Sequence, residues 1–184
     1  MSLNIANNYR AKIRGRSDAI LPSLIIDNAT AAIEFYKKVF NAQLMYLSEY
    51  NGKVVHAELL IGSSTIMLSD EFPWAKSAKT IGDTPIVLYT YVDNVDDTFK
   101  KAIDNGAKVD HAPEDAFYGD RMGSFIDPFN FRWVVAKHIR DVPNEEILAE
   151  QEKMFSTPKV KGGSNADYYK KYLKYKIKYD QLKF

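Results

Sequence analysis

The chain has 184 residues, of which 46% are hydrophobic and 27% are charged, a balance that fits one globular domain with additional segments. It contains no cysteine, which excludes disulfides, thiol nucleophiles and thiolate metal ligands. No apolar run approaches the roughly 20 residues that cross a bilayer. We therefore expect a soluble, cytoplasmic protein with no membrane partner.

Charge is distributed unevenly along the sequence. Residues 1–17 contain four Lys or Arg and no acid, and residues 156–184 contain eight Lys against two Asp. Residues 18–155 carry 13 basic and 22 acidic side chains, a net charge of −9. An acidic body with two basic ends predicts that the ends serve a different purpose from the core. We expect residues 1–18 to form a basic arm.

A strand followed by a helix opens the acidic body. The apolar run 24–26 is closed by an Asp-Asn pair, and Asn28 is a suitable N-cap. One apolar stripe at helical spacing then indicates a helix, with the residues Ala32, Ile33, Tyr36, Val39 and Phe40. Strand-like runs follow at 43–49, 54–61 and 65–69.

The same order of elements recurs 66 residues later. The run 89–92 ends at Asp93-Asn94, and the next helix has its own apolar stripe of Val95, Phe99, Ala102 and Ile103. Strand-like runs then occur at 108–111, 123–126 and 131–137. We therefore predict an α+β fold made by duplication of a strand–helix–three-strand unit, with modules at 19–80 and 84–140 in a domain of residues 19–140.

Three further segments follow this core. We predict a helix over 141–155, a linker over 156–166 and a second, Tyr- and Lys-rich helix over 167–184. In the last segment tyrosines recur at spacings of four and three residues, which is typical of a helix that docks on a partner. The alternative is that its lysines and tyrosines bind nucleic acid through phosphate contacts and base stacking.

Four stretches together resemble a known family: residues 21–36, 55–61, 65–70 and 118–133. They are similar to the glyoxalase/bleomycin resistance/extradiol dioxygenase superfamily, also called vicinal oxygen chelate, and within it to the PhnB-like subgroup. The resemblance implies two βαβββ modules that form an open, barrel-like mixed sheet around a ligand cavity, commonly in a homodimer. The C-terminal tail resembles tails of giant DNA virus proteins, which implies a location in the host cytoplasm or the virion.

Metal-dependent members of this superfamily carry four ligands that face the cavity. Carried over to this chain, the resemblance assigns these positions to Leu21, Glu58, Val87 and Val134. Only Glu58 has a side chain that binds a hard metal ion. We therefore predict no metal and no other cofactor; a shift of the alignment by one or two residues would bring His56 into the set.

Strand alternation predicts which polar side chains share a face with these positions. The predicted ligand-binding residues on strands are His56, Glu58, Tyr89, Tyr91 and Arg132. A few polar groups among apolar walls are typical of a small-molecule pocket, and Glu58 is the best single candidate for a catalytic group. Packing alternatives stay open: Glu58 pairs with Arg132 at the sheet surface, and the two tyrosines serve only the core.

Two further predicted site residues lie on connecting segments. Arg121, on a Gly-Asp-Arg turn, either binds an anion or braces Asp127. Trp74 lies in the connection 71–84 between the modules, a segment that we expect either to cover the pocket or to form part of a dimer interface.

Three functions remain open at this point. The favoured one is metal-free binding of a small organic ligand in the cavity. The second is a divergent metal-dependent lyase, isomerase or dioxygenase, or an enzyme that uses Glu58 as a base. The third is a non-catalytic interaction protein that acts through its basic ends.

Overall fold

The computed structural model describes residues 20–155. The chain divides into two compact units, Met1–Asp141 and Val142–Phe184, and each is considered by itself. The predicted basic arm (1–18), linker (156–166) and C-terminal Tyr/Lys-rich helix (167–184) lie outside the described residues.

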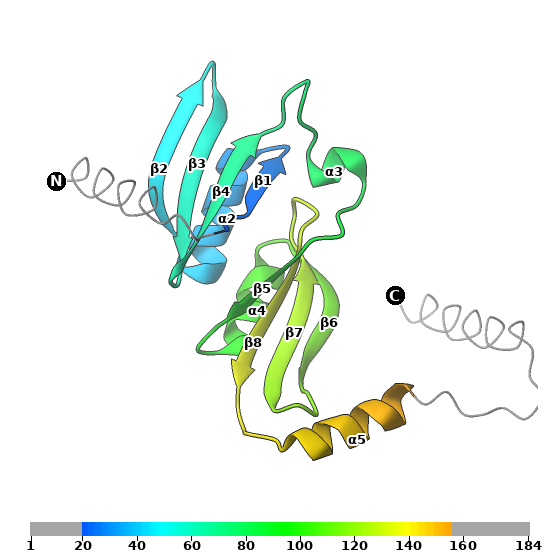
Figure 1. Ribbon diagram of the computed structural model, residues 1–184. Coiled ribbons are helices and arrows are strands. Elements are labelled where there is room, and N and C mark those ends of the chain that lie inside the picture. The colour runs from blue at the N-terminus through cyan, green and yellow to red at the C-terminus, as the bar shows by residue number, and fades with distance from the viewer. Residues whose placement is uncertain (1–19, 156–184) are drawn as a thin grey trace, which may run out of the picture. The chain divides into compact units, whose positions relative to one another are not determined.

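The first module contains one helix and a four-stranded mixed sheet. Its elements are β1 (Ser23–Ile26), α2 (Ala29–Phe40), β2 (Gln43–Tyr50), β3 (Lys53–Ile61) and β4 (Ser64–Asp70). The strand order is β1-β4-β3-β2, with β1 parallel to β4 and the other pairs antiparallel. In Figure 1 the helix α2 covers one face of this sheet.

The second module repeats this topology. Its elements are β5 (Val87–Tyr91), α4 (Val95–Asp104), β6 (Lys108–Asp115), β7 (Asp120–Ile126) and β8 (Arg132–His138). The strand order β5-β8-β7-β6 is the counterpart of the first sheet, again with one parallel pair, β5 with β8. The predicted α+β fold with duplicated βαβββ units is therefore confirmed, and the two sheets remain separate and open.

Some boundaries differ from the sequence-based expectation. Strand β6 continues to Asp115 instead of ending at 111, and β7 begins at Asp120 instead of 123. The added residues 112–115 and 120–122 are mostly polar and lack the alternation that marks a strand, and the register of β6 on β7 is irregular. A short helix between the modules, α3 (Ala78–Ile81), was not expected.

The ends of the two long helices follow directly from the sequence. The side chain of Asn28 accepts a hydrogen bond from the backbone N–H of Ala31 at 3.0 Å, and Asn94 accepts one from Asp97 at 3.1 Å. Both satisfy a backbone N–H that the first turn of a helix leaves without an intrahelical partner. After α4 the chain turns at Gly106, whose φ of +97° suits a residue without a Cβ atom.

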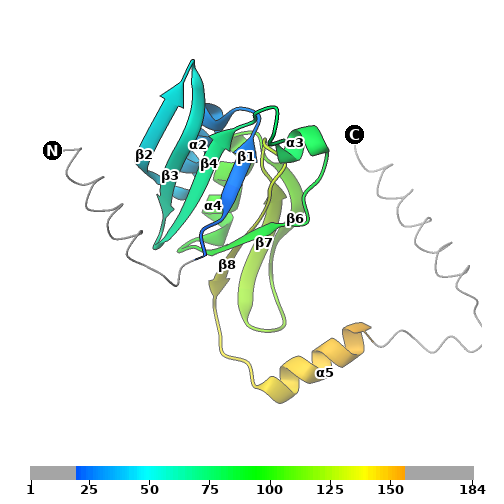
Figure 2. The ribbon, with the colours of Figure 1, turned by 45° about the horizontal axis from the view of Figure 1, so that its top comes forward.

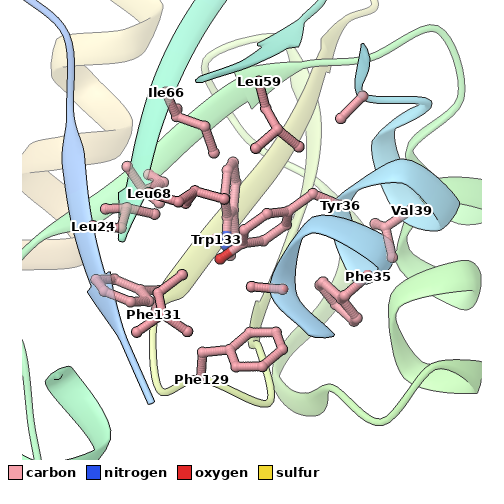
Figure 3. Packing of buried hydrophobic residues seen from close by; sticks show 14 of the residues in the cluster. Leu24, Phe35, Tyr36, Val39, Leu59, Ile66, Leu68, Phe129, Phe131 and Trp133 are labelled. Carbon is pink, nitrogen blue, oxygen red and sulfur yellow. The ribbon is translucent and has the colours of Figure 1, made fainter. Parts of the chain in front are cut away.

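An aromatic core joins the two modules. Figure 3 shows the rings of Tyr36, from α2, and Trp133, from β8, side by side at its centre, and their centroids are 5.4 Å apart. Both donate to the same oxygen of buried Asp127, the Tyr36 hydroxyl at 2.7 Å and the Trp133 indole N–H at 3.0 Å. The other Asp127 oxygen accepts the backbone N–H groups of Phe129 and Phe131, each at 2.9 Å. This carboxylate therefore ties the first module to the second.

The second unit contains the helix α5 (Asn144–Phe155), with Glu145 and Glu146 in its first turn. Acidic side chains at this end interact favourably with the helix dipole. In the part of the chain that the structure describes, no helix combines the length and the apolar character needed to cross a membrane.

Candidate ligand cavity between the modules

Each sheet has an open face, which we define as the face turned away from its helix. In the first module Leu24 and Ile26 are buried in the core, so Ser23 and Ile25 face the open side. In the second module Leu88 is buried and its neighbours on β5 are exposed. The open faces are where the sequence predicts the ligand site.

The register relates positions of the two open faces to each other. Ser23 on β1 pairs with Met67, which pairs with Glu58. On the second sheet Tyr89 pairs with Val134, which pairs with Ser124. Ser23 and Tyr89 are 66 residues apart, the spacing of the duplication, so Met67 is the counterpart of Val134. Glu58 is instead the counterpart of Ser124.

A cavity of about 450 Å³ lies where residues 20–22, directly before β1, approach β5. Figure 2 shows these two edge strands close together. Its walls include apolar side chains from both modules, Leu21, Ile61, Val87 and Trp133, together with the polar Thr65 and Tyr89. Of the seven ligand-binding residues predicted from the sequence, Tyr89 alone contributes to this wall.

His56 and Glu58 form a pair on the open face of the first sheet. Glu58 is only 5% exposed, and its Oε1 lies 3.1 Å from Nε2 of His56. The ring of Tyr46 lies next to that of His56, with 5.9 Å between centroids. The predicted partner of Glu58 in the packing alternative, Arg132, forms its ion pair elsewhere. The structure thus brings together two of the predicted residues as a carboxylate–imidazole pair.

Arg132 belongs to a polar group on the second sheet. Its Nε lies 3.2 Å from Oδ2 of Asp110, and the same oxygen accepts the hydroxyl of buried Ser124 at 2.7 Å. Arg132 is the β8 partner of Val87, which lines the cavity, so its backbone lies next to the cavity wall. Its ion pair, however, reaches across β7 toward β6, away from that wall.

Tyr89 and Tyr91 lie at the edge of a second polar group. The Tyr91 hydroxyl donates to Oδ2 of buried Asp120 at 3.0 Å, and Oδ1 of Asp120 lies 2.9 Å from Nδ1 of His138. Nε2 of His138 lies 3.0 Å from Asp141. Burial raises the pKa of Tyr89, the hydrogen bond to Asp120 raises the pKa of Tyr91, and the bonds to Asp120 and Asp141 raise the pKa of His138. Both phenols therefore stay protonated at neutral pH.

The two residues that the sequence placed on connecting segments do not line the cavity, and Arg121 lies on strand β7 instead of a turn. Arg121 binds Asp96 on α4 through two nitrogens, at 2.7 and 2.6 Å, and Asp115 through a third at 2.8 Å. It therefore braces the helix against the β6–β7 turn and does not contact Asp127. Trp74 is 81% exposed and stacks on Phe72, with ring centroids 5.1 Å apart; its role at a lid or interface stays a prediction.

Comparison with known proteins assigns the fold to a family. The profile of the Glyoxalase/Bleomycin resistance protein/Dioxygenase superfamily matches residues 18–135. An uncharacterized protein of Mycobacterium bovis is 38% identical over 137 residues, which cover 71% of this chain and 90% of the relative. The chain belongs to this superfamily.

Solved structures with a similar fold are known. TioX from Micromonospora aligns with a TM-score of 0.54 at 19% identity, covering 68% of this chain and all of TioX. A PhnB protein from Bacillus cereus aligns with a TM-score of 0.52 at 16% identity, covering 64% of this chain and 98% of that protein. At these identities the likeness concerns the fold.

The donor set of this superfamily member does not fit a catalytic metal ion. The register makes Met67, and not Glu58, the counterpart of Val134. The four positions that correspond to metal ligands are therefore Leu21, Met67, Val87 and Val134. Zinc, nickel, iron and manganese sites need several nitrogen or oxygen ligands, and these side chains offer one thioether sulfur. Within residues 20–155 no three His, Asp or Glu side chains are grouped to hold a metal ion.

Sequence reasoning missed Asp120 and His138, the polar centre beside Tyr91. The signal was present, because Asp120 precedes the singled-out Arg121 and His138 shares strand parity with Val134. What the sequence lacked was the register that pairs Asp120 with His138. Two residues 18 positions apart meet only after β7 and β8 have paired.

Proposed function

We propose that this chain is a metal-independent member of its superfamily that binds a small organic ligand in the cavity between its two modules. One observation carries the proposal. Leu21 and Val87 occupy the first-strand positions that a metal-dependent member would use for ligands, and here both are apolar walls of the cavity. The place of a metal site is thus lined for an apolar group.

The size and lining of the cavity support this function. About 450 Å³ falls within the roughly 300–1,000 Å³ of small-molecule sites, which are mostly apolar with a few polar groups that orient the ligand. Thr65 and Tyr89 supply such groups, one from each module. The ligand would therefore contact both halves of the duplication.

Tryptophan fluorescence provides the test. The chain has two tryptophans, and Trp74→Phe leaves Trp133, a wall of the cavity, as the only reporter. A panel of small aromatic and aliphatic compounds should contain members that change its emission and raise the thermal midpoint of the full chain. Val87→Trp, which places a large side chain in the cavity wall, should weaken or abolish binding in a thermal-shift assay on the otherwise unaltered chain.

Val55→Trp is the matched control for Val87→Trp. Both valines lie on strands and are similarly exposed, at 43% and 46%, but Val55 does not line the cavity. Binding that survives Val87→Trp as well as it survives Val55→Trp would contradict the proposed site.

A second function is favoured by the His56–Glu58 pair. A buried carboxylate that holds an imidazole is an arrangement used by general bases, and this pair lies on the open face of the first sheet. An enzyme of this kind would move a proton of a ligand without a metal. Turnover of any panel compound that disappears in both His56→Gln and Glu58→Gln would support catalysis; unchanged turnover in both variants would exclude the pair.

The interaction function of the basic ends stays a separate proposal, because those ends lie outside the described residues. Deletion of 156–184 tests it. If the full chain is retained on DNA in a salt-dependent way and the shortened chain is not, the tail binds nucleic acid. Equally weak retention of the full and the shortened chain would contradict this function.

A further inference from the structure

Two exposed aromatic rings lie together at the edge of the cavity. Tyr89 is a cavity wall and is 48% exposed, and Tyr91, two residues further along the same face of β5, is 64% exposed. Their ring centroids are 5.5 Å apart and their planes are inclined by 55°. Both rings are exposed beside the apolar hollow, where a ligand can reach their electron-rich faces.

Negative charge lies at the hydroxyl end of Tyr91. Asp120 is only 6% exposed and is held by the Tyr91 hydroxyl and by His138, and a second carboxylate, Asp141, binds the other nitrogen of His138. With His138 protonated this group carries a net charge of −1, and with His138 neutral it carries −2. Residues 18–155 as a whole carry −9.

We propose that Tyr89 and Tyr91 bind an organic cation of the alkylammonium class, whose apolar remainder occupies the cavity. A cation over the face of a tyrosine is attracted by the ring quadrupole, and Asp120, which accepts the Tyr91 hydroxyl, adds Coulomb attraction. The two guanidinium groups on this sheet are paired with other carboxylates, Arg132 through Nε with Asp110 and Arg121 with Asp96 and Asp115. The inference rests on the proposed function, since it names the chemical class of the ligand for the same cavity.

The cation and the proton on His138 act on the same carboxylate. Asp120 on β7 and Asp141 after β8 contact His138 directly, and Tyr91 on β5 donates to Asp120. Tyr89 and Tyr118 lie close to Tyr91. Loss of the His138 proton makes the group more negative. Affinity for a cation should therefore rise with pH through the raised pKa of His138.

The experiment uses three probes of nearly equal shape on the full chain with Trp74→Phe. Choline is the cation, 3,3-dimethyl-1-butanol (dimethylbutanol) is its neutral carbon isostere, and 3,3-dimethylbutanoate (dimethylbutanoate) carries a carboxylate. Titrations followed by Trp133 fluorescence should show choline bound about three- to tenfold more tightly than dimethylbutanol, the range that one or two cation–π contacts give. Dimethylbutanoate should bind most weakly of the three.

Variants of the tyrosines separate ring contact from packing. Tyr91→Phe keeps the ring and should keep most of the preference for choline, whereas Tyr91→Leu should bring the affinities for choline and dimethylbutanol to within about twofold of each other. Tyr50→Leu is the matched control at an exposed tyrosine outside the cavity, and it should keep the full preference. In His138→Gln the rise of choline affinity with pH should disappear.

The outcomes distinguish this inference from the proposed function. Equal binding of choline and dimethylbutanol, or tighter binding of dimethylbutanoate, would overturn the cation assignment and leave the cavity function standing. If none of the three probes, nor any compound of the wider panel, changes the Trp133 signal at millimolar concentration, the cavity function fails together with the inference.

Discussion

The hydroxyl of Tyr36 in the first module donates a 2.7 Å hydrogen bond to Asp127 in the second. The same carboxylate oxygen accepts the indole N–H of Trp133, whose ring forms part of the cavity wall. The contact that joins the two halves of the duplication therefore also orients a wall of the candidate site. Stability and ligand binding should be linked through it.

Removing the Tyr36 hydroxyl should weaken this joint. Tyr36→Phe keeps the buried ring and deletes one hydrogen bond to a carboxylate, a change that should lower the free energy of unfolding by about 1.5–3 kcal/mol. Urea unfolding at pH 7 measures the effect. Tyr50→Phe, at an exposed tyrosine, is the control and should stay within about 0.5 kcal/mol of the parent protein.

The same tyrosine should make the fold sensitive to alkali. Burial, the charge of Asp127 and the hydrogen bond to it raise the pKa of Tyr36 well above its usual value of 10.0. Above a pH of about 10 the unfolded chain loses this proton while the folded chain keeps it, so the contribution of Tyr36 is fully present below that pH and is lost as the pH rises.

The measurement compares the parent protein with Tyr36→Phe across this range. Their difference in unfolding free energy should shrink as the pH rises beyond about 10, because Tyr36→Phe has no proton to lose at this position. Other tyrosines, such as Tyr89, are common to both proteins and cancel. A difference that stays constant to the alkaline limit of reversible unfolding would show that the folded state does not hold the Tyr36 proton.

Replacing Arg121 should slightly lower the free energy of unfolding and leave the affinity for the ligand unchanged. Arg121→Gln removes ion pairs with Asp96 and Asp115 that are partly exposed, so the loss of stability should be below about 1 kcal/mol and smaller still in high salt. The hydrogen bond from Arg121 lowers the pKa of Asp96, so this contribution should fade as the pH falls into the acid range. The affinity for the probe, measured by Trp133 fluorescence, should be unchanged. A loss of affinity of more than about threefold would show that Arg121 contributes to ligand binding.

Removal of divalent metal should leave the protein as it was. After dialysis against a chelator, the thermal midpoint and the change in Trp133 fluorescence on probe binding should both be unchanged. The reason is that the four metal-ligand positions of the superfamily carry no oxygen or nitrogen donors in this chain. Elemental analysis of protein purified without chelator is the second measurement. One equivalent of nickel, zinc, iron or manganese that disappears in Glu58→Ala would contradict a metal-independent site.

The repeat of 66 residues was enough to predict the fold. Asn28 was recognisable as a helix cap, Asn94 stands at the same place in the repeat, and both side chains cap their helices. These features depend on local pattern. A pattern with period two or 3.6 is readable in one dimension because each residue's environment repeats along its own element.

The site was less predictable because its contacts depend on register between strands. His56 and Glu58 form a pair within one strand, whereas the alternative in which Glu58 pairs with Arg132 required a relation between two sheets. The counterpart of Val134 is Met67, a fact that follows only from the pairing of β1 with β4 and of β5 with β8. Asp120 and His138 were overlooked for the same reason.

The pairing of Ser23 with Met67 and of Tyr89 with Val134 has a consequence for how a ligand lies. The two modules share a topology, but the counterpart of the large aromatic Tyr89 is a small hydroxyl, and that of Tyr91 is Ile25. A ligand that spans the junction meets different chemistry at each end, so only one of its two orientations places its charged head over the rings. The duplicated fold therefore favours one orientation of the ligand over the other.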